Sequence, residues 1–306
     1  MEGFNGTFDD RKRSEMTMKT YAQDIKALSK YFKNVTDLVD VEKVMSTLKK
    51  NYGSKHTIKN KLAVISLIIK GLNEFPNKEE VRSKYIREIK ILDFDIAKEN
   101  AKHVKTDKQK ENWITKEDWQ NMLKHYDVSD DKDLNKLRDY IVLAIYSQVA
   151  LRNDLVDMII LPNFKYDEMK EKGIVPDTNI LLFDNDESKC KLILKKYKTA
   201  KVYGENHIEL EDIKDLDVYV GLYYYAKEEK RNSEVYLLSK LNGEPISGQA
   251  FCKYFKDLGK CINKDLSTTT IRHCAVSEIY DIMKLKKVAK RMGHSVHEAL
   301  SVYAKI

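Results

Sequence analysis

The chain has 306 residues, of which 42% are hydrophobic and 34% are charged, a composition typical of globular proteins and sufficient for two domains. Its longest apolar runs, at 63–69 and 140–146, are far shorter than the roughly 20 residues that a membrane span requires. The opening MEGFNGTFDD lacks the hydrophobic core of a signal peptide. We therefore expect an intracellular protein that does not enter a membrane.

The cysteines indicate neither a metal site nor a disulfide framework. None belongs to a CxxC pair or lies at the spacing from a histidine that zinc sites use. We interpret all four as buried, reduced thiols, and we expect no cofactor. They are Cys190, Cys252, Cys261 and Cys274.

The first part of the chain predicts a mobile arm followed by a small helical domain. Residues 1–14 contain two glycines and the basic cluster RKR, whereas residues 15–75 show helical periodicity. We expect Thr17 to cap a first helix, a second helix to run over 39–50, and Ser54 to cap a third. The expected buried faces are Met18, Tyr21, Ile25, Leu28 and Phe32 in the first helix, and Ile58, Leu62, Ile65 and Ile69 in the third.

Positive charge is concentrated in this domain. The net charge of the chain is only +7, but no acidic residue occurs between Glu42 and Glu74 while lysines recur throughout that stretch. Clustered lysines favour a polyanionic partner. We predict contacts to DNA phosphates from Lys49, Lys50, Lys55, Lys59 and Lys61.

The remaining sequence predicts a charged helical linker over 76–112 and a mixed second domain over 113–306. Thr115 and Ser247 are expected to cap helices, and the run at 133–150 predicts a strongly apolar core helix. Short β-type runs around 179–210 predict a small antiparallel sheet. The fold class is therefore α+β, mostly helical, with three further helices closing the chain.

Four stretches of this second domain carry candidate chemistry: VALRNDLVDM, LKKYKTAK, TTIRH and MGHSVHEALSVY. Together they resemble the tyrosine recombinase (phage integrase) family, whose signature is an arginine, a hairpin lysine, a His-x-x-Arg pair, a Gly-His and a tyrosine nucleophile. The steps from Arg272 to His294 and from His294 to Tyr303 match that signature. The helical domain resembles the core-binding domain of the family, so the resemblance extends over most of 15–306.

The resemblance implies a role for each matching residue. Tyr303 would attack a DNA phosphodiester, Arg152 and Arg272 would bind the non-bridging oxygens, and Lys198 would protonate the leaving 5′ oxygen. His294 would bind the phosphate or assist transfer of the phenol proton. Lys195, Lys196 and Lys201 compete with Lys198, although KTAK resembles the Lys-Thr-Gly hairpin of the family.

Two positions depart from the family pattern. Thr269 stands where the first histidine of the His-x-x-Arg pair is usual, and its hydroxyl can donate only one uncharged hydrogen bond. Asp154 lies two residues after Arg152, where the family often has an acid three residues after, and could still brace the guanidinium. His273 is out of register for the missing role, and we interpret it as a packed helix histidine.

The resemblance also implies partners: double-stranded DNA clamped between two domains, and a homotetramer that exchanges strands on two DNA sites through a Holliday junction. Only Ala304, Lys305 and Ile306 follow Tyr303. Either an exchange of C-terminal segments uses another element, such as the Tyr303 helix itself, or the sequence is a shortened form. The composition and ending look like integrases of mobile elements or large DNA viruses. The alternatives are a type IB topoisomerase and a non-catalytic DNA-binding protein with a degraded site, which Thr269 would permit.

Overall fold

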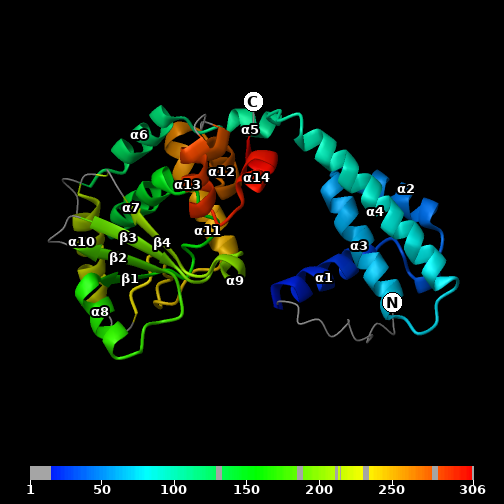
Figure 1. Ribbon diagram of the computed structural model, residues 1–306, viewed down its shortest axis with the longest axis horizontal. Helices are drawn as coiled ribbons and strands as arrows, with labels where there is room; N and C mark the ends of the chain where they lie inside the picture. Colours follow the sequence, from blue (N-terminus) through cyan, green and yellow to red (C-terminus); the bar gives the residue numbers. More distant parts are fainter. Residues whose placement is uncertain are drawn as a thin grey trace. The chain divides into compact units, whose positions relative to one another are not determined.

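The computed structural model describes residues 15–128, 133–184, 189–210, 213, 215–229, 234–277 and 282–304 (Figure 1). The expected arm over 1–14 lies outside these residues. The chain divides into two compact units, Met1–Lys102 and His103–Ile306. Within the described ranges, no helix is both long enough and apolar enough to cross a membrane.

The first unit is helical. Asp40 and Ser54 cap two of its helices by accepting hydrogen bonds from the backbone of Lys43 and Thr57, so the predicted cap at Ser54 is confirmed. The predicted cap at Thr17 is wrong, because the first helix already includes it. The elements are α1 (Glu15–Leu28), η1 (Val35–Leu38), α2 (Val41–Asn51), α3 (Lys55–Gly71) and α4 (Lys78–Asn100).

Helix α4 corrects the prediction of a linker over 76–112. Its residues Val81, Tyr85 and Leu92 are buried in the same apolar core as α2 and α3, and the Tyr85 hydroxyl donates to the Leu38 carbonyl at 2.8 Å. The apolar residues of α4 are few and widely spaced among charged residues, so the sequence did not show a buried face. Most of the expected linker is therefore part of the first unit.

The second unit is a mixed domain, which confirms the α+β, mostly helical fold class. Its helices include the expected apolar core helix and the helices capped by Thr115 and Ser247. They are α5 (Asp107–Glu111), α6 (Lys116–His125), α7 (Leu134–Gln148), α8 (Asn163–Glu171), α9 (Ala200–Tyr203), α10 (Leu216–Glu228), α11 (Gly248–Leu258), η2 (Gly259–Ile262), α12 (Thr268–Ser277), α13 (Ile282–Arg291), α14 (Val296–Glu298) and the π-helical turn η3 (Ala299–Tyr303).

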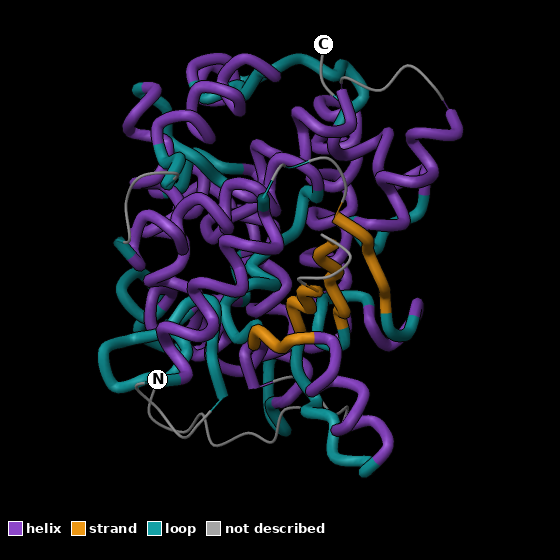
Figure 2. The backbone as a smooth tube through the Cα atoms, turned by 90° about the vertical axis from the view of Figure 1, so that its left-hand side faces the viewer, coloured by secondary structure: helices purple, strands orange, loops and turns teal. Residues whose placement is uncertain are grey.

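The sheet has four strands in the order β1-β2-β3-β4. Its strands are coloured orange in Figure 2. The predicted antiparallel sheet over 179–210 is confirmed, because β2, β3 and β4 pair antiparallel. The sequence did not predict β1, which runs parallel to β2 and makes the sheet mixed. Helix α8 connects these two strands, and a crossover helix is what allows consecutive strands to run parallel. The strands are β1 (Ile159–Pro162), β2 (Ile180–Asp184), β3 (Lys189–Leu194) and β4 (Asn206–Leu210).

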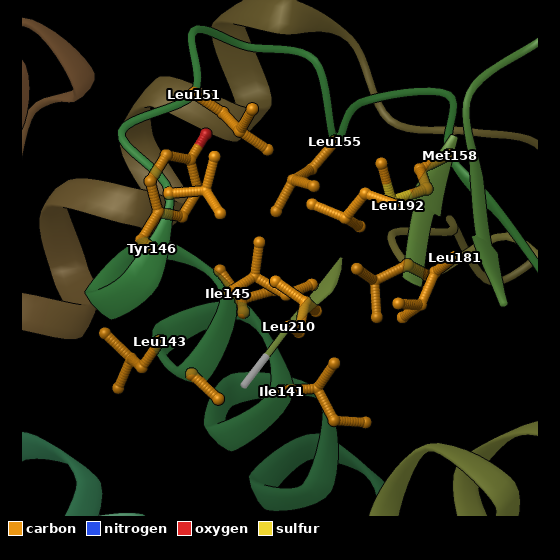
Figure 3. Close-up of a cluster of buried hydrophobic side chains, with 14 of the residues drawn as sticks. Ile141, Leu143, Ile145, Tyr146, Leu151, Leu155, Met158, Leu181, Leu192 and Leu210 are labelled. Atoms are coloured by element: carbon orange, nitrogen blue, oxygen red, sulfur yellow. The ribbon is translucent and has the colours of Figure 1, made fainter. Parts of the chain in front are cut away.

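Both faces of the sheet are covered. Side chains of Ile160, Leu181 and Leu192 join the main core beneath α7 and α10, whereas Ile159 and Ile180 face a smaller cluster that contains residues of α8. Figure 3 shows the main core packed between α7 and the strands. The loop that follows α7 is thereby fixed to the sheet.

Candidate active site

Arg152 lies on the loop between α7 and β1, and its backbone is held on both sides. The flanking side chains of Leu151 and Leu155 are buried in the main core (Figure 3). The Tyr146 hydroxyl donates to the Arg152 carbonyl, and the Arg152 amide donates to the Asp154 carboxylate at 2.9 Å. Asp154 therefore braces the backbone of Arg152, whereas the sequence suggested that it would brace the guanidinium.

Arg272 lies on α12 and is nearly fully buried, with 4% of its surface exposed. Its Nε and Nη2 atoms are buried and find no hydrogen-bond partner within the described ranges. Burial, reinforced by the like charge of Arg152, lowers the pKa of Arg272 to about 10, against the opposing effect of Tyr303, Tyr146 and Asp154. A guanidinium in this state is electrostatically unsatisfied and would gain from a bound anion.

His294 follows a tight turn at Gly293, which has a φ of +65°. The His294 ring is buried, and its Nε2 lies 2.7 Å from Nη2 of Arg152. Because a guanidinium can only donate, Nε2 accepts this bond and the proton of the neutral ring resides on Nδ1. Nδ1 lies 2.9 Å from the Glu298 carboxylate, at ion-pair distance but outside hydrogen-bond geometry.

Burial and the two arginines lower the pKa of His294, although Glu298 opposes this. The neutral imidazole is therefore favoured near neutral pH. A neutral ring can accept a proton, as a general base must, once its bond to Arg152 is released.

Tyr303 ends the π-helical turn and packs between two histidines. Its ring centroid lies 5.2 Å from that of His294 and 5.3 Å from that of His273. The Nδ1 of His273 donates to the Tyr303 carbonyl at 2.9 Å, and Nδ1 of His103 donates to the Ala304 carbonyl at 2.9 Å. The prediction that His273 is a packed helix residue is confirmed, whereas its bond to the tyrosine backbone was not indicated by the sequence.

Lys198 lies in the turn between β3 and α9, beside the His294 turn. Thr199, the next residue, donates through its hydroxyl to the Gly293 carbonyl at 2.7 Å. Among the competing lysines, Lys195 donates to the Pro176 carbonyl at 3.1 Å and Lys196 pairs with Asp177 at 3.5 Å. Lys198 is exposed, and no ion pair involving it is found among the described residues. This geometry favours it over Lys195 and Lys196 and leaves Lys201 open.

Thr269 lies one helical turn before Arg272 on α12, so the two share a face of that helix. It is exposed to solvent. Its hydroxyl is therefore accessible to solvent, unlike the buried side chains of Arg272, His294 and Tyr303. The structure brings together Arg152, Arg272, His294 and Tyr303, and sets the Lys198 turn against them.

A cavity of about 510 Å³ opens beside this cluster. Gly293 and His294 form one side, the aromatic rings of Tyr197 and Tyr203 contribute apolar surface, and the exposed Lys290 of α13 adds positive charge. Among the residues that the structure describes, no group of three or more His, Cys, Asp or Glu side chains is arranged to hold a metal ion. The side chains that the structure brings together at the cluster are two guanidiniums, an imidazole and a phenol.

Of the five lysines predicted to contact DNA, three form ion pairs among the described residues and two do not. Lys61 is buried, and its Nζ lies 2.6 Å from the Asp24 carboxylate, so the prediction that it contacts phosphates is wrong. Lys55 and Lys59 do share a face, but α4 sets carboxylates against them. Lys49 and Lys50 are exposed at the end of α2, with no ion pair recorded in the described part of the chain.

These ion pairs explain why the acid-free stretch is a poor measure of the surface charge. The partner of Lys59 is Asp93 at 2.8 Å, and that of Lys55 is Glu99 at 2.6 Å, both on α4. A lysine-rich face in the sequence can be neutralised by acids from a helix that folds onto it. Of the five predicted contacts, Lys49 and Lys50 are the two that remain available without breaking an ion pair.

No protein-family profile matches this sequence, and no curated protein matches it. Among solved structures, the crystal structure of XerA recombinase aligns with 96% of this chain and 88% of its own, at 14% sequence identity and a TM-score of 0.44. A resemblance this distant assigns neither a family nor an activity. Function has to be inferred from the residues themselves.

Proposed function

We propose that this protein is a DNA strand-transferase of the tyrosine recombinase type, which cleaves and rejoins DNA through a phosphotyrosyl bond. The observation that carries the proposal is that the buried guanidinium of Arg272, beside Arg152, His294 and Tyr303, has two nitrogens, Nε and Nη2, without a hydrogen-bond partner among the described residues. Two guanidiniums close together repel each other, and both gain when a phosphate enters between them. A phosphodiester is the substrate that satisfies both and presents an atom for Tyr303 to attack.

In the first step, the Tyr303 oxygen attacks phosphorus while the bond from phosphorus to the 5′ oxygen breaks. Negative charge grows on the non-bridging oxygens, where Arg152 and Arg272 donate hydrogen bonds that stabilise the transition state. The Arg152 bond to His294 is exchanged for one to phosphate, which frees Nε2 of His294 to take up the phenol proton. The exposed hydroxyl of Thr269 supplies a weaker donor in place of an imidazole.

The leaving 5′ oxygen needs a proton, and Lys198 is the expected donor. The hydrogen bond from Thr199, the next residue, to the carbonyl of Gly293 supports this assignment, because it holds the turn beside His294. Rejoining is the reverse reaction, in which a 5′ hydroxyl attacks the phosphotyrosine and Lys198 takes up the proton. Because the phosphotyrosyl bond conserves the energy of the original linkage, no ATP is consumed.

DNA binding by the first unit belongs to the same proposal. Lys49 and Lys50 would position the duplex through phosphate contacts, and Lys55 and Lys59 could add to them only by releasing their carboxylates. Such contacts are non-specific and weaken with salt. A tetramer on two DNA sites, a Holliday junction and an intracellular location with access to DNA are also part of the proposed function.

The test uses a duplex library with a randomised central segment, because the target sequence is unknown. Covalent complexes are trapped by denaturation and their DNA is sequenced. We expect the wild type to yield adducts enriched in one sequence, and Tyr303→Phe to yield none because it keeps the ring but lacks the nucleophilic oxygen. DNA binding without adducts in the wild type would refute the proposal and favour the non-catalytic alternative.

A second measurement separates recombinase from topoisomerase. Plasmids that carry two copies of the enriched sequence are incubated with the protein. Exchange of the segment between the copies supports recombination. Relaxation of supercoils without any exchange would refute it and favour the topoisomerase alternative.

A further inference from the structure

The side chain of Asn179 is fully buried and makes four hydrogen bonds. It lies immediately before β2. Its Nδ2 donates to the carbonyls of Asp154 and Lys196, each at 2.9 Å. Its Oδ1 accepts from the amides of Lys195 and Lys196, at 2.9 Å and 2.8 Å. Both donors and both acceptor sites of the amide are therefore used.

These four bonds connect two segments of the proposed active site. The bond to Asp154 reaches the loop that carries Arg152, and the other three reach the start of the turn that carries Lys198. The two segments are otherwise separate in sequence, at 149–157 and 195–199. A second connection lies farther along the turn, where Thr199 donates to the Gly293 carbonyl beside His294.

No other common side chain can make the same four bonds. An aspartate has the same shape but no donors, so its oxygen would face the carbonyls of Asp154 and Lys196. A leucine is similar in size but would leave two amides and two carbonyls buried without partners. The site therefore requires a carboxamide of this length.

We propose that Asn179 is a positioning residue, which holds the Lys198 turn at the correct distance from the Arg152 loop for proton transfer to the leaving group. The inference rests on the proposed function. In the step concerned, the bond from phosphorus to the 5′ oxygen breaks as the Lys198 ammonium gives that oxygen its proton. Since three of the four bonds hold the Lys198 turn, loss of Asn179 affects this transfer more than it affects phosphate binding by Arg152.

Chemistry offers a test that distinguishes positioning of the acid from a general structural role. When sulfur replaces the bridging 5′ oxygen, the leaving group is a thiolate, which departs without a proton because thiols are far more acidic than alcohols. A defect in the acid should then disappear. A defect in phosphate binding or in the nucleophile should remain.

The experiment measures adduct formation on two duplexes of the selected sequence, one with the natural oxygen and one with bridging sulfur. For Asn179→Asp and Asn179→Leu we expect a loss of roughly 10²-fold on the oxygen duplex, the size typical of general acid catalysis and of small misplacements. On the sulfur duplex we expect rates close to wild type, as for Lys198→Ala. The ratio of the two rates does not depend on how much of a variant is folded.

Two controls fix the interpretation. Thr178→Val removes the adjacent hydrogen bond to the Asp157 carbonyl, at 2.9 Å, which does not involve the Lys198 turn, and should show no sulfur-specific rescue. Arg272→Met should be slow on both duplexes. Asn179 variants that keep the wild-type rate on oxygen, or that sulfur does not rescue, would overturn the inference. A wild type that forms no Tyr303 adduct on either duplex would overturn the proposed function and this inference with it.

Discussion

Replacing Gly293 by alanine tests the contact between the Lys198 turn and the His294 turn. Gly293 has a φ of +65°, which costs an alanine about 1–2 kcal/mol. An added Cβ would also lie 2.6 Å from the Thr199 hydroxyl oxygen and 2.8 Å from a ring carbon of Tyr197. Overpacking of this kind typically costs a further 1–3 kcal/mol, so we expect Gly293→Ala to lower the free energy of unfolding by about 2–5 kcal/mol.

The chain provides a matched control at Gly173. Its φ is +67°, but an added Cβ would meet no atom within 4 Å. Gly173→Ala should therefore show the backbone cost alone, about 1–2 kcal/mol. The difference between the two variants in urea unfolding isolates the cost of the contact.

The two variants should also differ in their rates of DNA cleavage. In Gly293→Ala, relief of the clash moves Thr199 and the Lys198 turn away from His294, and displacements of about 1 Å can cost roughly 10²-fold in rate. Gly173→Ala should cleave at the wild-type rate. Equal losses of stability in the two variants, or full cleavage activity in Gly293→Ala, would refute this account of the contact.

Substitutions at five further positions test other parts of the structure. Arg272→Met removes a buried charge whose Nε and Nη2 have no hydrogen-bond partner in the described part of the chain, so we expect unchanged or higher stability in thermal unfolding. Adduct formation should fall at least about 10³-fold, and a marked loss of stability would contradict this. Burial and the arginines lower the pKa of His294 in the folded protein below its unfolded value of about 6.5. The neutral ring therefore contributes stability above about pH 6.5, and this stability is lost as the pH falls through the lowered pKa of the folded protein. His294→Gln, which keeps an acceptor, should lose less stability than wild type between about pH 7 and pH 5, and parallel pH profiles would argue against this. Lys61→Met leaves the Asp24 carboxylate without its ion-pair partner and should lower the free energy of unfolding by about 3–5 kcal/mol. Lys50→Ala should leave stability unchanged but weaken binding to random duplex DNA at low salt, and the reverse pattern would contradict the division of the lysines. His273→Leu should slow adduct formation more than His273→Asn, whose amide can replace the Nδ1 donor; equal rates would exclude a role for that bond.

Features governed by nearby residues could be predicted from the sequence. Ser54, Thr115, Ser247 and Ser295 each accept a hydrogen bond from the backbone amide three residues later. A cap depends only on its own turn of helix, so the pattern of a hydroxyl before an apolar periodicity is sufficient. The left-handed turn at Gly293 was predictable for the same reason.

Features that depend on distant segments could not be predicted. The carboxylates opposite Lys55 and Lys59 lie on α4, more than thirty positions farther along the chain. Strand β1 is short and buried on both faces, so it shows no alternation, and its parallel pairing depends on the α8 crossover. Asn179 has no neighbour in sequence that marks it, because all its side-chain bonds are to backbone atoms at least 16 positions away.

The position of Tyr303 combines both kinds of information. Its spacing from His294 is visible in the sequence, but the helix that carries it continues as a π-helical turn and stops there. The last carbonyls of a helix lack partners within the helix, and here the carbonyls of Tyr303 and Ala304 accept bonds from His273 and His103. Because these donors come from α12 and from the start of the second unit, the end of the helix is fixed to two separate parts of the domain. The backbone of the proposed nucleophile is therefore held in place before any DNA is bound, which limits the reorganisation that its attack requires.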